Sequence, residues 1–231
     1  MEPSKLSNSP YVQANPGGLV SKLSWWARRQ MFMMLMALAK PTEVTKVLDV
    51  GVTNDRREDC NFFEKLYPYP HQITAIGLED ASFLEEEFPG LTYMQADGLN
   101  LPFPDQHFDL VFSSAVVEHV GNRDRQRAFV HELCRVSHRC CVTTPNRWYP
   151  IEFHTLLPLV HWLPPRIFRR ILQWLGKEFW AKEENLNLLS EQELQALFPT
   201  GMTLQTRRVR LLGFVSNLLV YSNSQSSAVH L

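Results

Sequence analysis

The residues of this sequence best suited to binding chemistry are acidic side chains that end three successive apolar segments. They are Asp49, followed closely by the turn residue Gly51, then Glu79 with its neighbour Asp80, and then Asp97. A carboxylate in the second position can accept both hydroxyls of a ribose, and one in the third can accept from the exocyclic amine of an adenine. Because three carboxylates would repel a phosphate, the pattern predicts a site for a nucleoside without one.

Strands must bring these side chains together, and apolar runs predict such strands at regular intervals. The runs lie at 45–50, 72–77, 91–96, 108–113 and 139–144, and helical patterns separate them at 57–68 and 122–136. Strands that alternate with helices form right-handed crossovers and a parallel sheet covered on both faces. Two further β-rich runs, 202–211 and 214–221, predict a hairpin with an antiparallel strand at one edge. The expected fold is therefore α/β, a Rossmann-like doubly wound sheet that is mostly parallel.

Several motifs in this part of the chain resemble those of class I S-adenosylmethionine-dependent methyltransferases, in particular the small type 11 branch. They are Val-Leu-Asp-Val-Gly at 47–51, Gly-Leu-Glu at 77–79, Leu-Pro-Phe-Pro-Asp at 101–105, Phe-Asp-Leu-Val at 108–111 and Glu-His-Val at 118–120. The resemblance covers about 45–147 and implies S-adenosylmethionine as cofactor. By position, it assigns the methionine end to Asp49 and Gly51, the ribose to Glu79, the adenine to Asp97 and Gly98, and the methionine and sulfonium to Ser113 and Ser114. Asp80 is the alternative ribose ligand if the strand register differs.

The turn after the first strand departs from the Gly-x-Gly-x-Gly pattern of the family. Thr53 and Asp55 stand where the second and third glycines are expected. Asp tolerates a positive φ better than most residues, whereas a β-branched Thr stands where the backbone would approach the cofactor. We expect the Thr53 hydroxyl or Asp55 to bond the cofactor's ammonium group. The alternative is a catalytically silent methyltransferase fold that binds or scaffolds a partner. A nicotinamide oxidoreductase is disfavoured by the same missing glycines.

Two histidines are candidate general bases for methyl transfer to a hydroxyl. His119 follows the fourth predicted strand, and His154 lies in a Pro- and aromatic-rich insertion after the fifth. His161 is a weaker candidate in the same insertion, and Glu118 is interpreted as structural. For each histidine the alternative is an ordinary hydrogen bond to a neighbouring carbonyl or carboxylate.

The chain divides by pattern into an N-terminal arm and helix, 1–44, and a methyltransferase domain, 45–231, in which 145–186 forms a lid over the ligand edge. A helix is expected at 21–40, and Ser190 with Glu193 predicts a capping box for a later helix. The lid's aromatic residues favour a small apolar or aromatic acceptor. Its basic amphipathic stretch, 164–175, is expected to pack onto the lid, with weak contact to an anionic membrane surface as the alternative.

Composition excludes several other classes of protein. The chain has 231 residues, 45% of them hydrophobic, and a formal net charge of -1, which argues against nucleic acid as a partner. Its four cysteines lack C-x-x-C spacing, so neither a zinc framework nor a disulfide scaffold is expected. The apolar run at 31–39 is too short to span a bilayer, and no signal-peptide pattern is visible, so a cytoplasmic location is expected.

Overall fold

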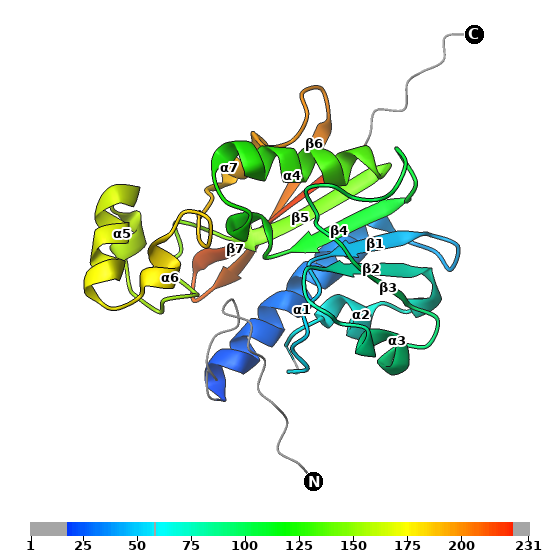
Figure 1. Ribbon diagram of the computed structural model, residues 1–231, viewed down its shortest axis with the longest axis horizontal. Coiled ribbons are helices and arrows are strands. Elements are labelled where there is room, and N and C mark those ends of the chain that lie inside the picture. Colours follow the sequence, from blue (N-terminus) through cyan, green and yellow to red (C-terminus); the bar gives the residue numbers. More distant parts are fainter. Residues whose placement is uncertain (1–17, 58, 224–231) are drawn as a thin grey trace.

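A single seven-stranded sheet organises the molecule, and its strand order is β3-β2-β1-β4-β5-β7-β6 (Figure 1). The computed structural model describes residues 18–57 and 59–223, so residues 1–17 of the predicted arm lie outside the described chain. The strands are β1 (Val47–Val50), β2 (Ile73–Gly77), β3 (Thr92–Gln95), β4 (Leu110–Ser114), β5 (Arg139–Pro145), β6 (Thr203–Leu211) and β7 (Phe214–Asn223). All neighbouring pairs are parallel except those of β7, which runs antiparallel to both β5 and β6. The predicted fold class is confirmed.

Helices cover both faces of this sheet, as the alternating pattern predicts. They are α1 (Leu19–Ala39), α2 (Phe62–Leu66), α3 (Phe83–Glu87), α4 (Arg123–Arg135), α5 (Pro165–Trp174), α6 (Glu178–Ala181) and α7 (Glu191–Gln195), with short 3₁₀ turns η1 (Pro70–Gln72), η2 (Val117–His119) and η3 (Val160–Trp162). In Figure 1, α1, α2 and α3 lie on one side of the sheet and α4 and α7 on the other. Because both faces are covered, β1 is buried along its whole length.

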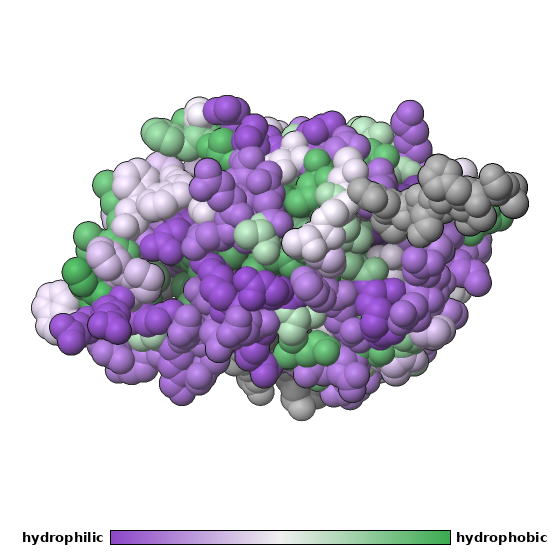
Figure 2. All heavy atoms as spheres, turned by 90° about the horizontal axis from the view of Figure 1, so that it is seen from above, coloured by the Kyte–Doolittle hydropathy of each residue, from purple (hydrophilic) through white to green (hydrophobic). Residues whose placement is uncertain are grey.

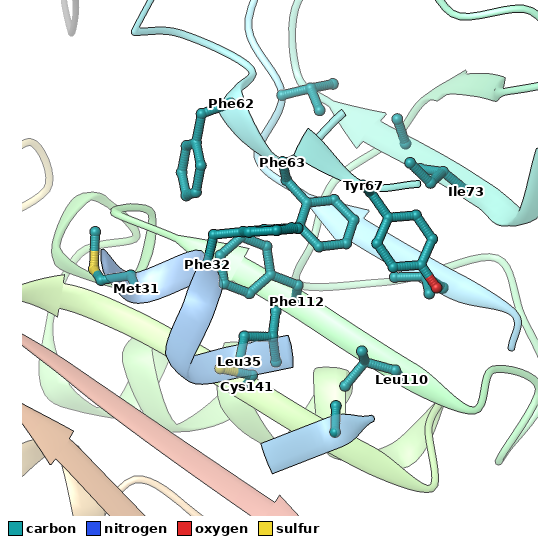
Figure 3. Close-up of a cluster of buried hydrophobic side chains, with 14 of the residues drawn as sticks. Met31, Phe32, Leu35, Phe62, Phe63, Tyr67, Ile73, Leu110, Phe112 and Cys141 are labelled. Carbon is teal, nitrogen blue, oxygen red and sulfur yellow. The ribbon is translucent and has the colours of Figure 1, made fainter. Parts of the chain in front are cut away.

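The core on the α1 side is rich in aromatic rings that reach from helices to strands. Phe63 of α2 lies 5.0 Å from Phe112 of β4 between ring centroids, and Phe32 of α1 lies 6.0 Å from Phe63 (Figure 3). Leu35 of α1 and Cys141 of β5 are fully buried in the same cluster. The N-terminal helix is thus part of the core rather than an appendage to it.

Two local predictions are confirmed, and one is wrong in its extent. The β6–β7 hairpin turns at Leu212 and Gly213, which both have positive φ, as a two-residue hairpin turn requires. Ser190 and Glu193 form the predicted capping box of α7. The helix predicted at 57–68 is reduced to α2, because residues 51–57 and 59–61 are not helical.

The lid segment, 145–186, forms a lobe at one end of the molecule and contains η3, α5 and α6 (Figure 1). Phe168 and Leu172 bury one face of α5 in a small cluster of its own. Ile167 and Trp174 on α5 remain 47% and 85% exposed, and hydrophilic and hydrophobic side chains are intermixed over this end of the molecule (Figure 2). Contact of α5 with a membrane surface stays a prediction. Within the described residues, no helix has the length and apolar character needed to cross a bilayer.

Candidate active site

A cavity of about 390 Å³ opens where the strand order reverses, between the carboxyl ends of β1 and β4. Open α/β sheets bind their ligands at this switch point. Side chains of α1, the β1 turn and α2 form one wall, and the lid residues Tyr149, Phe153 and His154 form another. Of the predicted site residues, the cavity is lined by Asp49, Gly51, Thr53, Ser114, His119 and His154.

Asp49 lies in the floor of the cavity with a second carboxyl group beside it. Asp49 is 7% exposed, and Glu64 of α2 is 2% exposed. Burial first, and then the charge of Glu64, raise the pKa of Asp49 well above its usual value, and burial raises the pKa of Glu64. Two buried carboxyl groups this close do not readily both ionise, so this pair can neutralise a cationic ligand group by releasing a proton.

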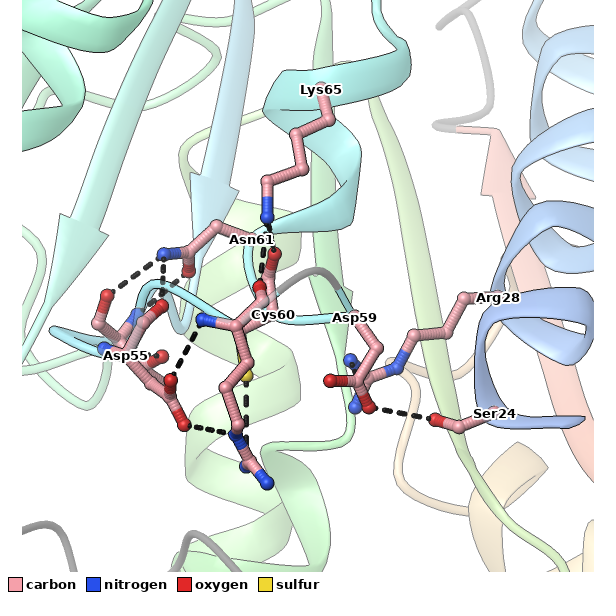
Figure 4. Close-up of polar contacts among 9 residues, drawn as sticks. Ser24, Arg28, Asp55, Asp59, Cys60, Asn61 and Lys65 are labelled. Carbon is pink, nitrogen blue, oxygen red and sulfur yellow. Dashed lines mark hydrogen bonds and ion pairs between the residues drawn. The ribbon is translucent and has the colours of Figure 1, made fainter. Parts of the chain in front are cut away.

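The loop that replaces the glycine turn is held by the side chain of Asn61 (Figure 4). Asn61 Oδ1 accepts from the Thr53 backbone N–H at 3.0 Å, and Asn61 Nδ2 donates to the carbonyls of Thr53 and Asp55 at 2.9 and 3.3 Å. Lys65 Nζ donates to the Arg57 and Cys60 carbonyls at 2.9 and 2.8 Å. Side-chain hydrogen bonds therefore hold this loop, which lacks the second and third glycines of the family pattern.

This arrangement gives Thr53 and Asp55 roles that differ from those expected. Asp55 is buried, accepts the Arg57 backbone N–H, and pairs with Arg57 Nε at 2.7 Å. The Thr53 hydroxyl accepts from the Asp55 N–H at 3.4 Å. Asp55 is not among the residues that line the cavity, so its expected bond to the cofactor's ammonium is not supported; its carboxylate serves the loop.

Two arginines that the sequence analysis did not single out face this cavity. Arg28 of α1 and Arg57 of the loop both line it. Asp59 joins the loop to α1, because it accepts from Ser24 at 3.2 Å and pairs with Arg28 at 3.5 Å (Figure 4). A basic pair at the methionine end is suited to a carboxylate. The sequence carries no signal for this role, because Arg28 lies in a helix without a visible motif and Arg57 lies in a loop that departs from the family pattern.

The nucleoside-binding candidates lie at the ends of β2 and β3, outside the cavity lining. Glu79 follows β2, and its Oε2 atom is buried without a hydrogen-bond partner in the described chain. Asp80 is exposed and accepts the Ser82 N–H at 2.9 Å, which lowers its pKa. Asp97 is exposed and accepts the Leu99 N–H at 2.9 Å, beside the buried Gly98. Asp80 thus serves a local turn, and Glu79 is the carboxylate left for a ligand.

The two serines that end β4 differ in their surroundings. Ser113 is fully buried, and its hydroxyl donates to the Val50 carbonyl at 2.8 Å, tying β4 to β1. Ser114 lines the cavity, and its hydroxyl is 2.8 Å from that of Thr143. Successive residues of a strand face opposite sides, so only one of the pair can reach the ligand. The cofactor role expected for the Ser113 side chain is therefore not supported.

His119 and His154 come together at the lid side of the cavity, with ring centroids 4.7 Å apart. Burial, and then the neighbouring His154, lower the pKa of His119 to about 3, and its Nδ1 bonds the Asn185 carbonyl at 2.7 Å. Burial opposes charge on His154, but the charge and the 2.7 Å hydrogen bond of Glu152 raise its pKa overall. His161 is buried and bonds the Tyr149 carbonyl at 2.8 Å, outside the cavity lining.

Glu118 completes this group from the η2 turn. It is fully buried, and its Oε2 accepts from the Thr144 hydroxyl at 2.9 Å. Burial raises its pKa to about 7. Thr144 is the hydrogen-bond partner of one carboxylate oxygen, and the other, Oε1, lies 4.0 Å from His119 Nε2.

Comparisons with known proteins agree with this geometry. A family model described as a methyltransferase domain matches residues 60–139, a stretch that begins after the altered turn. A probable S-adenosylmethionine-dependent methyltransferase of Mycobacterium tuberculosis (strain H37Rv) is 28% identical over 129 residues, which are 54% of this chain and 44% of that protein. The chain therefore matches less than half the length of this curated relative.

Solved structures share the fold at low sequence identity. The YcgJ protein of Bacillus subtilis superposes with a TM-score of 0.55 and 14% identity, covering 84% of this chain and 98% of its own. The N-methyltransferase NodS of Bradyrhizobium japonicum, solved with S-adenosyl-l-homocysteine, superposes with a TM-score of 0.54 and 12% identity, covering 86% of this chain and 87% of its own. The strand order and the site at its switch point define a class I methyltransferase fold. The family match over residues 60–139 and the relative make this chain similar to class I S-adenosylmethionine-dependent methyltransferases, as the sequence motifs predict.

Proposed function

We propose that the chain transfers a methyl group from S-adenosylmethionine to a small, largely apolar or aromatic acceptor bound in the switch-point cavity. The observation that carries this proposal is the composition of the cavity. Its sheet side offers Asp49, Gly51 and two arginines, while its lid side offers the aromatic side chains Tyr149 and Phe153. A charged cofactor end and an apolar acceptor therefore have adjacent surroundings of matching chemistry.

Residues of the site fit the proposed cofactor at both of its ends. Glu79 has a buried, unpaired carboxylate oxygen at the position from which the family binds ribose hydroxyls. Gly51, which lines the cavity, has a φ of +118°, and a Cβ there would meet Val116 Cγ2 at 2.1 Å, so both the backbone conformation and the packing of Val116 require glycine at this turn. Arg28 and Arg57 would hold the methionine carboxylate, and the Asp49–Glu64 pair its ammonium.

When bound, S-adenosylmethionine supplies a methyl group on a positively charged sulfur, which is already strongly electrophilic. The protein's main task is to hold a nucleophilic atom in line with that bond, an effect worth up to about 7–11 kcal/mol in well-oriented reactions. Tyr149 and Phe153 are stacked at 5.0 Å with an interplanar angle of 5° and form a flat wall for such an acceptor. His119 and His154 line the same cavity, and their ring nitrogens would lie beside the acceptor's reacting atom.

General-base catalysis by one of these histidines stays a prediction. With a pKa of about 3, His119 binds a proton too weakly to remove one from a hydroxyl near neutral pH. His154 is the better candidate, because an ionised Glu152 beside it favours the charged imidazole. Burial opposes the ionisation of Glu152, but the charge and hydrogen bond of His154 outweigh burial and lower the pKa of Glu152 to about 2.

Isothermal titration of the full chain with S-adenosylmethionine, S-adenosylhomocysteine and NAD tests the proposal. We expect both sulfur compounds to bind and NAD not to bind, followed by S-adenosylhomocysteine release when phenols, quinols or polyprenyl alcohols are supplied as acceptors. Failure of both sulfur compounds to bind at millimolar concentration would refute the enzyme and favour the silent scaffold. Turnover on peptides alone would refute the acceptor class.

A further inference from the structure

Three side chains that could ligate a metal ion converge where the lid meets the sheet. They are Glu118 and His119, on the η2 turn after β4, and His154 of the lid. One ligand atom from each lies within 4.8 Å of the other two. His119 Nε2 is 4.0 Å from Glu118 Oε1, and both histidines line the switch-point cavity.

Each of these side chains is oriented through its second polar atom. His119 Nδ1 bonds the Asn185 carbonyl at 2.7 Å, and His154 Nδ1 bonds Glu152 Oε1 at 2.7 Å. Glu118 Oε2 accepts from the Thr144 hydroxyl at 2.9 Å. Metal-binding histidines almost always donate their other ring nitrogen to a carbonyl or carboxylate in this way, which fixes the tautomer and directs the remaining nitrogen toward the ion.

One atom of the cluster lacks the partner that its burial requires. Glu118 is 0% exposed, and its Oε1 has no hydrogen-bond partner within residues 18–57 and 59–223. A buried polar atom left in this state is destabilising. Because Oε1 is the oxygen near His119, a cation at the centre of the cluster would satisfy it.

We propose that Glu118, His119 and His154 bind a divalent transition-metal ion, with zinc or iron(II) as the class of ion that suits them. Two imidazoles and one carboxylate match the nitrogen and oxygen preference of these ions, whereas magnesium and calcium favour oxygen alone. Ligands at about 2.0–2.2 Å from one ion stand roughly 3–3.5 Å apart, so binding draws the three atoms together by about 1 Å.

Both histidines line the cavity, so a ligand in the cavity could reach the remaining coordination positions of an ion bound here. Glu118 and Glu152 supply two negative charges near the ion. In the proposed methyl transfer, the ion would bind an acceptor oxygen and lower the pKa of its hydroxyl, and it would take the place of His154 as the activating group, because both ring nitrogens of His154 are then engaged. This role rests on the proposed function, whereas ion binding itself does not.

Metal binding is testable on the full chain without any turnover assay. Protein stripped with a chelator and dialysed is titrated with Zn²⁺ by calorimetry, and with Co²⁺ by visible absorption, which reports coordination number. We expect one ion per chain, a visible Co²⁺ spectrum of a four- or five-coordinate site, and a higher Tm with Zn²⁺. His154→Asn and Glu118→Gln should weaken Zn²⁺ binding about 100-fold or more, while His131→Asn, an exposed histidine of α4, should leave it unchanged.

Circular dichroism and the Tm of the metal-free variants show whether they fold. The ion stoichiometry and the Tm shift are also measured on the unmodified chain, so that part of the test does not depend on the folding of any variant. Absence of a stoichiometric site in the unmodified chain would overturn the proposal. So would unchanged Zn²⁺ affinity in folded His154→Asn and Glu118→Gln. Titration of the metal-free chain with S-adenosylhomocysteine separates the two proposals. If the chain binds S-adenosylhomocysteine but no metal ion, the metal site alone is refuted. If it binds the metal ion but not S-adenosylhomocysteine, the methyltransferase is refuted.

Discussion

Replacing Asn61 by alanine should loosen the loop from Thr53 to Asp55 and weaken cofactor binding. Asn61 makes three hydrogen bonds to that loop, at 3.0, 2.9 and 3.3 Å, and it is only partly exposed. A typical intramolecular hydrogen bond contributes about 0.5–1.5 kcal/mol, so their loss should lower the free energy of unfolding by roughly 2–4 kcal/mol.

The backbone of Asn61 adds a second, separable term. Its φ is +48°, in the left-handed region, where alanine is strained by about 1–2 kcal/mol and glycine is not. Asn61→Gly is therefore the matched control, because it loses the hydrogen bonds without the strain. Asn61→Asp keeps the acceptor for the Thr53 N–H and loses both donors.

Urea unfolding and calorimetry with S-adenosylhomocysteine measure the two effects. All three variants should bind the ligand at least about tenfold more weakly, a change of about 1.4 kcal/mol, and Asn61→Ala should be less stable than Asn61→Gly. An Asn61→Ala protein with stability within about 0.5 kcal/mol of the unmodified chain and unchanged ligand affinity would refute the conclusion that this side chain replaces the glycines.

Three further predictions concern the carboxylates and the turn. Glu79→Ala should weaken S-adenosylhomocysteine binding by about 1.5–3 kcal/mol, as for loss of a charge-assisted hydrogen bond. Calorimetry measures this, with Asp80→Ala as the control, and loss of affinity in Asp80→Ala alone would contradict the assignment of Glu79. Because the Asp49–Glu64 pair keeps a proton that the unfolded chain releases above about pH 4, its contribution to stability falls as pH rises, by up to about 1.4 kcal/mol per pH unit. Glu64→Gln should flatten this dependence in urea unfolding between pH 5 and 8, and parallel profiles would show that the pair does not titrate as a unit. Gly51→Ala should destabilise the chain and abolish ligand binding, through the clash with Val116, whereas Gly201→Ala, also at positive φ but with open space around it, should cost only strain; equal losses in Tm would count against the clash.

Much of the sheet is predictable because its strands have a simple physical signature. Parallel strands that are buried on both faces read as short continuous apolar runs, and the run at 45–50 coincides with the fully buried β1. The capping box at Ser190 and the hairpin at Gly213 depend on neighbours in sequence, so local rules are enough for them.

The loop from Gly51 to Asn61 is beyond such rules because its structure depends on contacts at longer range. Asn61 reaches back eight residues to Thr53, and Asp59 reaches across to α1. No periodicity in the sequence marks these bonds. Comparison with the glycine pattern leads to the expectation that Thr53 or Asp55 binds the cofactor, whereas both side chains make hydrogen bonds within the loop. The departure from the family pattern is nevertheless visible in the sequence, and it marks the loop that Asn61 holds.

The histidine cluster is predictable in part. The sequence selects His119 and His154 one by one from their positions near the ligand edge, but their contact depends on how the lid folds back. Glu118 is interpreted as structural because a buried carboxylate beside a helix usually orients something. Only the three-dimensional arrangement shows that one of its oxygens has a partner and that the other, within the described residues, does not.

The small apolar cluster inside the lid has a consequence for how this protein can change. Phe168, Leu172, Ala181 and Leu186 of the lid, with Leu188 just beyond it, form a cluster separate from the two clusters on the faces of the sheet. Under the proposed function, substitutions on the lid's inner wall would therefore alter acceptor preference while the strands of the sheet keep their own packing. Exchange of the whole segment between related chains would then be a direct route to hybrids with a new acceptor preference.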